Sequence, residues 1–306
     1  MPHALLFHGP AGVGKLALAE RFAKLLLCER RRTGGQACGT CEGCRWFAAG
    51  SHPDIRFVEP ESMSRQLAGQ GEEGDESLTP SARKPSTEIK IDQVRGLETF
   101  LNTGSHRGGW RIALVHPAEE MNRHAADAML KALDEPPGRA VFLLVSHRAA
   151  RLPATIRSRC VAVPVGVPPA ADALAWLEQR GVREAARWLA YSGGAPLKAE
   201  RLAAEAGDFP LEVVRRVVET GVPSGIDDRA SLEAFAEGLQ KLALDRAFLA
   251  LAGRAKYAPG TGAPKRAGDA RAWLDFARRM GRDRALAAHP LNPRLFAAAM
   301  LAGIPA

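Results

Sequence analysis

The sequence of 306 residues has no apolar run that approaches the roughly 20 residues needed to span a membrane. Its N-terminus also lacks the charged segment, apolar segment and cleavage site that together make a signal peptide. We therefore expect a cytoplasmic protein without membrane contact. Disulfide bonds are not expected in that reducing compartment, so the five cysteines call for another explanation.

The composition excludes little else. A hydrophobic fraction of 46% is that of an ordinary globular protein, and the length allows two or three domains. The net charge of +8 suits a nucleic-acid partner. Arginines scattered over solvent-facing helices would give the same balance, so charge alone is weak evidence for such a partner.

A glycine-rich loop follows the first apolar stretch, Ala4 to Phe7, and precedes a helix-like segment from Leu16 to Leu27. Strand, loop and helix are the context in which backbone N–H groups and a helix N-terminus bind phosphate. The alternative is a turn that merely joins a strand to a helix. The loop fits the pattern G-x-x-x-x-G-K, and its candidate nucleotide-binding residues are Gly9, Gly12, Gly14 and Lys15.

The acidic and hydroxyl groups of a nucleotide hydrolase are missing. Leu16 stands where a Ser or Thr would hold Mg²⁺. The buried strand predicted at Arg111 to Val115 is followed by His116-Pro117, whereas a hydrolase has Asp-Glu there to organise Mg²⁺ and activate water. Glu119 stands a few residues further on and is the remaining candidate for such a role. We therefore expect no hydrolysis, and ATP binding is doubtful.

Four of the five cysteines lie close together after the first helix, at Cys28, Cys38, Cys41 and Cys44. Four thiolates at this spacing suit a tetrahedral Zn²⁺ ion, and four ligands leave no open position, so the zinc would be structural. The spacing also resembles part of an iron–sulfur ligand set. Unligated thiols are a third interpretation.

Strands that alternate with helices predict a doubly wound α/β domain with a parallel sheet at residues 1–164. The four-cysteine module (about 28–44) and an aperiodic insertion (about 61–86) interrupt it. Only helices are predicted beyond it, in a small domain at 165–207 and a larger α-helical domain at 208–306.

Several motifs occur in the order seen in bacterial clamp-loader subunits, which are AAA+ proteins of the DNA polymerase III holoenzyme. They are the glycine loop, the four cysteines, Ala-Met-Leu-Lys-Ala-Leu-Asp-Glu-Pro-Pro at 128–137 and Ile-Arg-Ser-Arg-Cys at 156–160. The chain resembles this family over residues 1 to about 200. The resemblance implies an AAA+ domain, a helical lid and a collar domain through which subunits assemble.

Within the family, the departures at Leu16 and His116-Pro117 resemble the delta-prime type, which does not hydrolyse ATP. That resemblance implies partners: gamma/tau and delta subunits, primed DNA and, indirectly, the sliding clamp. It also implies that Arg159, in the motif Ser158-Arg159-Cys160, is an arginine finger for a neighbouring ATPase. No ATPase or polymerase site is expected in the chain itself, although it would be part of the DNA-directed DNA polymerase III holoenzyme.

Two other functions remain open. One is an active AAA+ ATPase of the gamma/tau type, and the other is a zinc-dependent interaction module. Family members usually have about two dozen further residues before the first strand, and an Arg that senses nucleotide where this chain has Leu197-Lys198. Either Met1 is not the true start or the chain is truncated. Both departures make nucleotide binding less secure.

Overall fold

The computed structural model describes residues 2–32, 34–63, 85–259, 269–287, 289 and 291–305. The chain forms two compact units, Met1–Val167 and Pro168–Ala306. Most of the insertion expected at 61–86 lies outside the described residues. Among the residues described, no helix has the length and apolar character required to cross a membrane.

A five-stranded parallel sheet forms the centre of the first unit, and its strand order is β2-β3-β4-β1-β5. Because parallel strands end at the same edge, the loops after β1, β3 and β4 meet at one side of the sheet. This arrangement confirms the predicted fold class. The strands are β1 (Ala4–His8), β2 (Ile55–Val58), β3 (Arg111–Val115), β4 (Ala140–Ser146) and β5 (Val161–Pro164).

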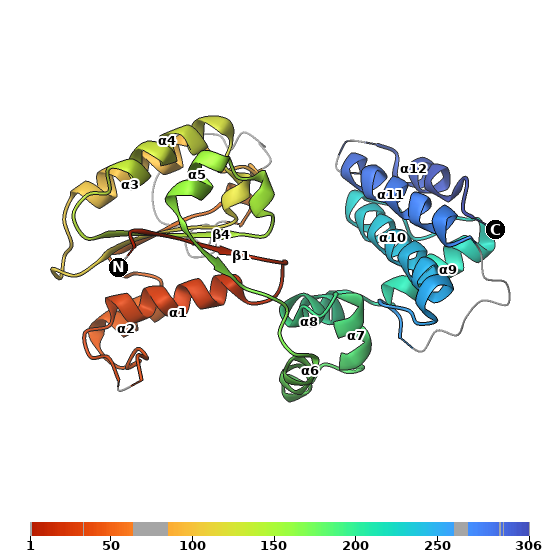
Figure 1. The fold of residues 1–306 in the computed structure, drawn as a ribbon, viewed down its shortest axis with the longest axis horizontal. Helices are drawn as coiled ribbons and strands as arrows, with labels where there is room; N and C mark the ends of the chain where they lie inside the picture. Colours follow the sequence, from red (N-terminus) through yellow and green to blue (C-terminus); the bar gives the residue numbers. More distant parts are fainter. Residues whose placement is uncertain are drawn as a thin grey trace, which may run out of the picture. The chain divides into compact units, whose positions relative to one another are not determined.

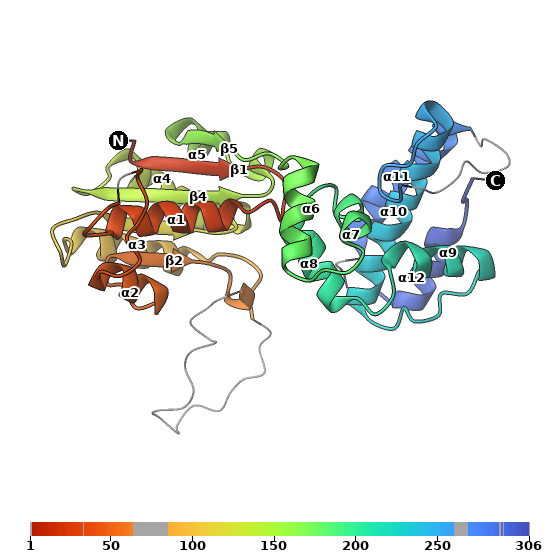
Figure 2. The same ribbon diagram turned by 90° about the horizontal axis from the view of Figure 1, so that it is seen from below.

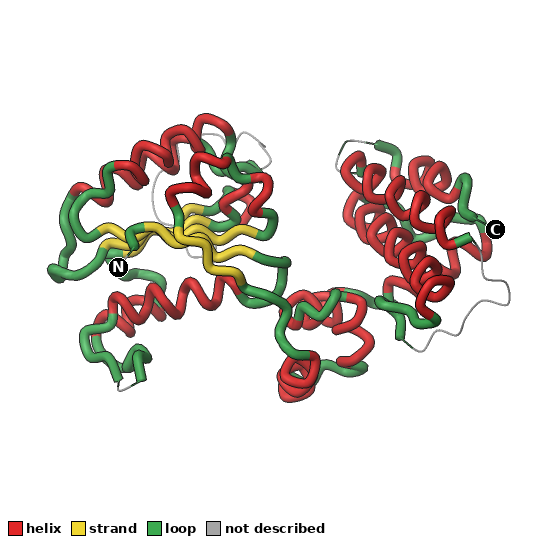
Figure 3. Tube along the Cα trace, in the orientation of Figure 1, coloured by secondary structure: helices red, strands yellow, loops and turns green. Residues whose placement is uncertain are grey.

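Helices cover both faces of this sheet, as Figures 1 and 3 show. Alternate residues of a strand point to opposite faces, so Leu5 and Phe7 pack with α1, while Ala4 and Leu6 pack with the α3–α5 layer. Both layers are apolar, as a sheet buried on two sides requires. The helices of this unit are α1 (Lys15–Leu27), α2 (Glu42–Ala48), α3 (Ile91–Asn102), α4 (Arg123–Asp134) and α5 (Ala154–Arg159), with 3₁₀ turns at Glu61–Met63, Ala118–Glu120 and Ala149–Arg151.

The second unit is entirely helical in the residues described (Figure 2). Buried side chains from all seven of its helices belong to one hydrophobic core, whose aromatic members are Trp188, Tyr191, Phe209, Phe235 and Phe276. The predicted division of this unit at residue 207 stays a prediction. The helices are α6 (Ala170–Gln179), α7 (Ala185–Tyr191), α8 (Pro196–Glu205), α9 (Pro210–Thr220), α10 (Arg229–Ala252), α11 (Ala270–Leu286) and α12 (Pro293–Leu301).

One carboxylate connects three helices of the second unit. Glu237 on α10 accepts hydrogen bonds from Lys198 on α8 and from Lys241 one turn further along α10, both at 2.6 Å. Its other oxygen accepts from Arg284 on α11 at 2.9 Å. The Lys241 ammonium also lies 3.6 Å from the centre of the Tyr191 ring. We call Glu237, Lys198, Lys241 and Arg284 the Glu237 cluster.

Gly9 is a position of the loop at which the fold excludes a side chain. Its φ of +149° is a conformation that other residues rarely adopt, and an added Cβ would lie 2.0 Å from the Val165 carbonyl oxygen. That close approach follows from pairing beyond the end of β5, where the Val165 N–H donates to the His8 carbonyl at 2.8 Å.

We expect Gly9→Ala to lower the free energy of unfolding by at least about 2 kcal/mol, because strain and a backbone clash act together. Urea unfolding of the full chain measures this. Gly166→Ala is the matched control, since nothing lies within 4 Å of its added Cβ and its φ is ordinary. Equal stabilities of the two variants would contradict the role given to Gly9.

Candidate functional site: a strand-end loop, a cysteine cluster and an exposed arginine

The glycine loop joins β1 to α1, as the sequence predicts. Gly9, Gly12 and Gly14 all have positive φ, and α1 begins directly at Lys15. Lys15 is 2% exposed, and its ammonium donates to the carbonyl of Pro10 in its own loop. Burial lowers the pKa of Lys15 to about 8, although the carboxylate of Glu119 opposes this shift. The strand–loop–helix arrangement of a phosphate loop is present, while phosphate binding by these residues stays a prediction.

Two imidazoles occupy the strand ends beside this loop. His116 follows β3 and is 6% exposed, and its Nε2 lies 3.3 Å from Nε2 of His147, which follows β4. Burial, together with the charge of Lys15, lowers the pKa of His147. At neutral pH the site therefore presents a neutral ring, which is a poor ligand for Mg²⁺.

Glu119 belongs to the same site. Its carboxylate accepts the backbone N–H of His147 at 2.9 and 3.2 Å, and its charge acts on Lys15. The sequence places Glu119 only a few residues beyond β3, so its position next to Lys15 required the three-dimensional fold. Because its oxygens already accept from the backbone, Glu119 is held by the protein rather than directed freely into the loop.

The four cysteines come together as the sequence predicts. Cys28, Cys38, Cys41 and Cys44 are buried, and their sulfurs lie within 4.8 Å of one another. Cys28–Cys41 and Cys38–Cys44 are 4.0 and 3.9 Å apart, close to the ~3.8 Å between ligands of a tetrahedral Zn²⁺ with bonds of ~2.3 Å. In the described part of the chain, the candidate metal-binding group consists of these four cysteines.

Backbone groups of the module are directed at the sulfurs. The N–H groups of Thr40 and Cys41 donate to the sulfur of Cys38 at 3.4 and 3.3 Å, and they lower the pKa of Cys38 to about 5. The N–H of Cys38 donates in turn to Cys28 at 3.2 Å. Such donors stabilise thiolates, which are the form that binds metal. The donor set therefore fits a bound metal ion.

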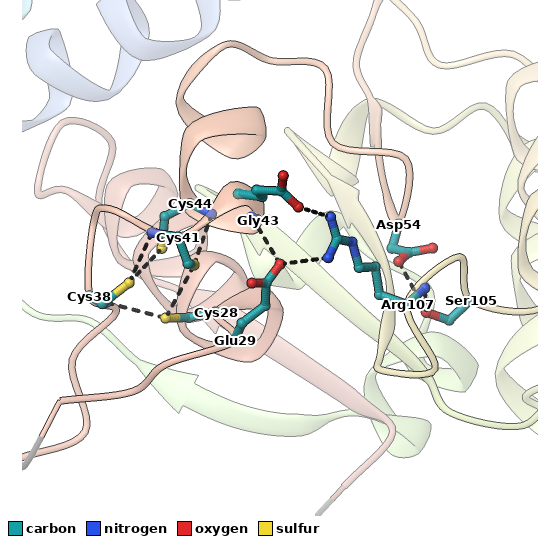
Figure 4. A network of polar contacts seen from close by, with 10 residues as sticks. Cys28, Glu29, Cys38, Cys41, Gly43, Cys44, Asp54, Ser105 and Arg107 are labelled. Atoms are coloured by element: carbon teal, nitrogen blue, oxygen red, sulfur yellow. Dashed lines mark hydrogen bonds and ion pairs between the residues drawn. The ribbon is translucent and has the colours of Figure 1, made fainter.

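Arg107 attaches this module to the α/β domain (Figure 4). Its guanidinium lies 3.2 Å from Glu29, forms an ion pair with Glu42 and stacks 4.5 Å from the centre of the Trp46 ring. The loop that carries Arg107 is held by buried Asp54, which accepts from the hydroxyl of Ser105 at 3.0 Å. Arg107 thus helps to fix the module to the domain, together with Phe47 of α2, which packs against the sheet core.

Arg159 ends α5 and lies on the surface, with 36% of its side chain exposed. Its guanidinium forms an ion pair with Asp134 and donates to the carbonyl of Thr155 at 3.1 Å. Ser158 is exposed beside it. Cys160 is partly buried against the core, and burial raises its pKa to about 11, so it is a packing residue rather than a reactive thiol.

The structure groups the predicted site residues in separate places. The glycine loop, Lys15 and His116 form one site, the four cysteines form a second, and Arg159 lies on the surface at the end of α5. His147 and Arg107 were missed by sequence reasoning. His147 had a usable signal, since it directly follows the apolar strand β4 at the edge where the loops after β1 and β3 also end. No sequence signal pointed to Arg107, because its partners lie more than 60 residues away in sequence.

The parallel sheet and the glycine loop define a P-loop-type α/β protein, and comparison with known proteins narrows that class. Residues 1–167 match the family described as "DNA polymerase III, delta subunit". The chain is 41% identical over 250 residues to the DNA polymerase III subunit delta' of Pseudomonas aeruginosa, covering 80% of this chain and 68% of that protein. The chain therefore belongs to the delta-prime family of DNA polymerase III clamp-loader subunits.

Other relatives are less similar in sequence. The DNA polymerase III subunit tau of Salmonella typhimurium is 32% identical over 159 residues, which is 52% of this chain and 21% of that protein. Among solved structures, a DNA polymerase III gamma subunit-related protein from Thermotoga maritima matches with a TM-score of 0.46 and 18% identity, covering 98% of this chain and 93% of that one. The matched part of this chain spans about half the length of several further delta-prime relatives.

Proposed function

We propose that this chain is a non-hydrolysing subunit of the clamp loader that helps to place the sliding clamp on primed DNA during replication. It would assemble with gamma/tau and delta subunits in the cytoplasm and contact the clamp only indirectly. DNA contact would be to phosphates, through basic residues. Its own contribution would be a rigid surface and Arg159, offered to the nucleotide of an adjacent subunit.

The observation that carries the non-hydrolysing role is the pair of imidazoles at the strand ends. Hydrolysis needs carboxylates there to hold Mg²⁺ and activate water. His116 and His147 stand in that place 3.3 Å apart, and Leu16 replaces the hydroxyl that would bind the metal. ATP binding without hydrolysis is compatible with the loop, and we give the loop no further role.

Arg159 suits a finger role because its side chain lies on the surface and is held by a single carboxylate of its own chain. In a loader reconstituted with the gamma/tau and delta subunits, we expect Arg159→Ala to reduce ATP turnover at the one site it serves by about 10³-fold, the lower end for arginine fingers. Steady-state ATPase measured with clamp and primed DNA shows this as the loss of that site's share of the total rate.

Arg157→Ala is the matched control for this experiment. Arg157 lies two residues earlier on the same helix and is also exposed, so its removal changes the net charge equally. We expect it to leave the ATPase rate nearly unchanged. If Arg159→Ala loaders that assemble normally hydrolyse ATP at the wild-type rate, Arg159 is not a finger.

A gamma/tau-like ATPase is the second candidate, favoured by the 32% identity to a tau subunit over about half of the chain. It predicts that the isolated chain hydrolyses ATP and that Lys15→Ala abolishes this activity. The proposed function predicts no turnover by the isolated chain. The same ATPase assay, run on the chain alone and on the assembled loader, separates the two.

We further propose that the four cysteines bind a structural Zn²⁺. The sulfur spacing suits tetrahedral zinc, and the module contains few apolar residues besides the cysteines, so a metal would supply its folding energy. All four positions are protein ligands, which leaves no site for a reacting water. The zinc would therefore hold the module in shape and take no part in a reaction.

A further inference from the structure

A cavity lies away from the glycine loop, between α3 and the edge of the sheet at β2 and β3. Its volume is about 370 Å³, which is within the range of ligand sites. Two of its lining residues are arginines and none is acidic. The lining residues are Pro53, Arg56, Gly96, Thr99, Phe100, Thr103, His106 and Arg111.

Both guanidiniums of this cavity stack on the same aromatic ring. The guanidinium carbon of Arg111 lies 4.5 Å from the centre of the Phe100 ring, and that of Arg56 lies 5.1 Å from it. Stacking engages the flat face of a guanidinium and leaves its N–H edge available for hydrogen bonds. Phe100 therefore holds two cationic donors in fixed positions beside one cavity.

The hydrogen-bonding capacity of these arginines is largely unused. Arg111 is only 4% exposed, yet its Nε has no hydrogen-bond partner, and the nearest carboxylate oxygen, on Asp54, is 3.7 Å away. Asp54 instead accepts from the backbone N–H of His106 at 2.9 Å and from Ser105. Within the described part of the chain, Arg56 has no carboxylate at ion-pair distance.

A buried guanidinium with unfilled donors is costly unless an acceptor is supplied. We propose that this cavity binds a phosphate group, with Arg56 and Arg111 as its charged donors. A phosphate carries up to two negative charges and several acceptor oxygens, which matches two guanidiniums better than a single carboxylate does. The phosphate belongs either to a free anion or to a nucleic-acid strand.

The test is calorimetric titration of the full chain with inorganic phosphate and, separately, with a short single-stranded DNA in low-salt buffer. Arg56→Gln removes one donor from an exposed position and keeps the fold. We expect it to weaken phosphate binding by at least about tenfold. Arg95→Gln is the matched control: it lies on α3 outside the cavity, is 65% exposed and removes the same charge, and we expect unchanged binding.

Lys15→Ala distinguishes this cavity from the glycine loop, which is the other place where phosphate would bind. Binding that survives Lys15→Ala and is lost in Arg56→Gln supports the cavity. Binding lost in Lys15→Ala and kept in Arg56→Gln overturns it, as does equal affinity in all variants. If Arg56→Gln weakens DNA binding as well as phosphate binding, the phosphate is that of the strand, and if phosphate alone is affected it is the free anion.

Discussion

Cys44→Ser is expected to abolish metal binding and to unfold the four-cysteine module. Cys44 is 1% exposed, and its sulfur lies 3.9 Å from that of Cys38. Structural Zn²⁺ contributes about 10–16 kcal/mol to folding in zinc-finger peptides, so the loss of one ligand removes most of what stabilises such a module. Metal analysis of the purified chain and hydrogen exchange of residues 28–48 measure the two effects.

Cys160→Ser is the control for this variant, because Cys160 lies outside the cluster. It should retain the wild-type metal content and the wild-type exchange protection of the module. A wild-type chain that is protected from exchange and carries no metal would refute the zinc proposal. If the metal analysis finds iron and the chain has a visible absorption band, the cysteines bind an iron–sulfur cluster and not zinc.

Glu237→Gln is expected to lower the free energy of unfolding by roughly 3 kcal/mol. Glu237 has 16% of its side chain exposed, and its charge faces Lys198, Lys241 and Arg284. Removing one partner of a buried ion pair costs about 3–5 kcal/mol. The lower end applies here, because Lys241 would stay buried without compensation, whereas the side chain of Arg284 is 45% exposed and solvated. Thermal unfolding of the full chain measures the loss. Glu233→Gln is the matched control on the same helix, where an exposed pair with Arg229 contributes under about 1 kcal/mol.

The pKa values of the cluster show why the loss on mutation exceeds the net contribution of the pair. Despite burial, the neighbouring Lys241 and Lys198 lower the pKa of Glu237 to about 2. Burial lowers the pKa of Lys241 to about 8 even beside Glu237, so the ammonium remains under-compensated. Glu237 favours the charged form of Lys241, but the cost of burying the ammonium is larger, so the net stabilisation by the pair is smaller than the loss on mutation.

The lowered pKa of Glu237 also predicts how the stability of the chain depends on pH. A carboxylate whose pKa is lower in the folded chain stabilises it fully above the unfolded pKa of about 4.5, and this contribution is lost as the pH falls towards 2. We therefore expect the wild-type chain to lose more stability than Glu237→Gln between pH 5 and about pH 2. Parallel stability curves for the two proteins over this range would contradict the assignment.

The sequence predicted the elements that rest on local patterns. The strands predicted at Ala4 to Phe7 and Arg111 to Val115 and the helix predicted at Leu16 to Leu27 lie where the apolar runs placed them, within one residue at each end. Asn122, a residue type that favours helix N-termini, caps α4: its side chain accepts from the N–H of Ala125 at 2.9 Å. These features depend on neighbours within a few residues, which a single sequence contains.

Side-chain pairs between residues far apart in the chain could not be predicted from the sequence. Lys198 appears in it only as a departure from the family pattern, whereas the fold hydrogen-bonds it to a carboxylate 39 residues away. Helix α2 inside the cysteine module was also missed, because the glycines and cysteines there suggest only turns. Packing decides both, since a short helix and a buried charge are stable only through tertiary contacts.

The loop after α3 contacts both the cysteine module and the cavity beside β2 and β3. Arg107 on this loop contacts the cysteine module, while His106, next to it, lines the cavity proposed to bind phosphate, and Asp54 holds the loop and faces Arg111. If each ligand favours one position of this loop, the two binding reactions are thermodynamically linked, and the linkage is reciprocal. We therefore expect a chain depleted of metal to change its affinity for phosphate, and phosphate to change the affinity for metal by the same factor.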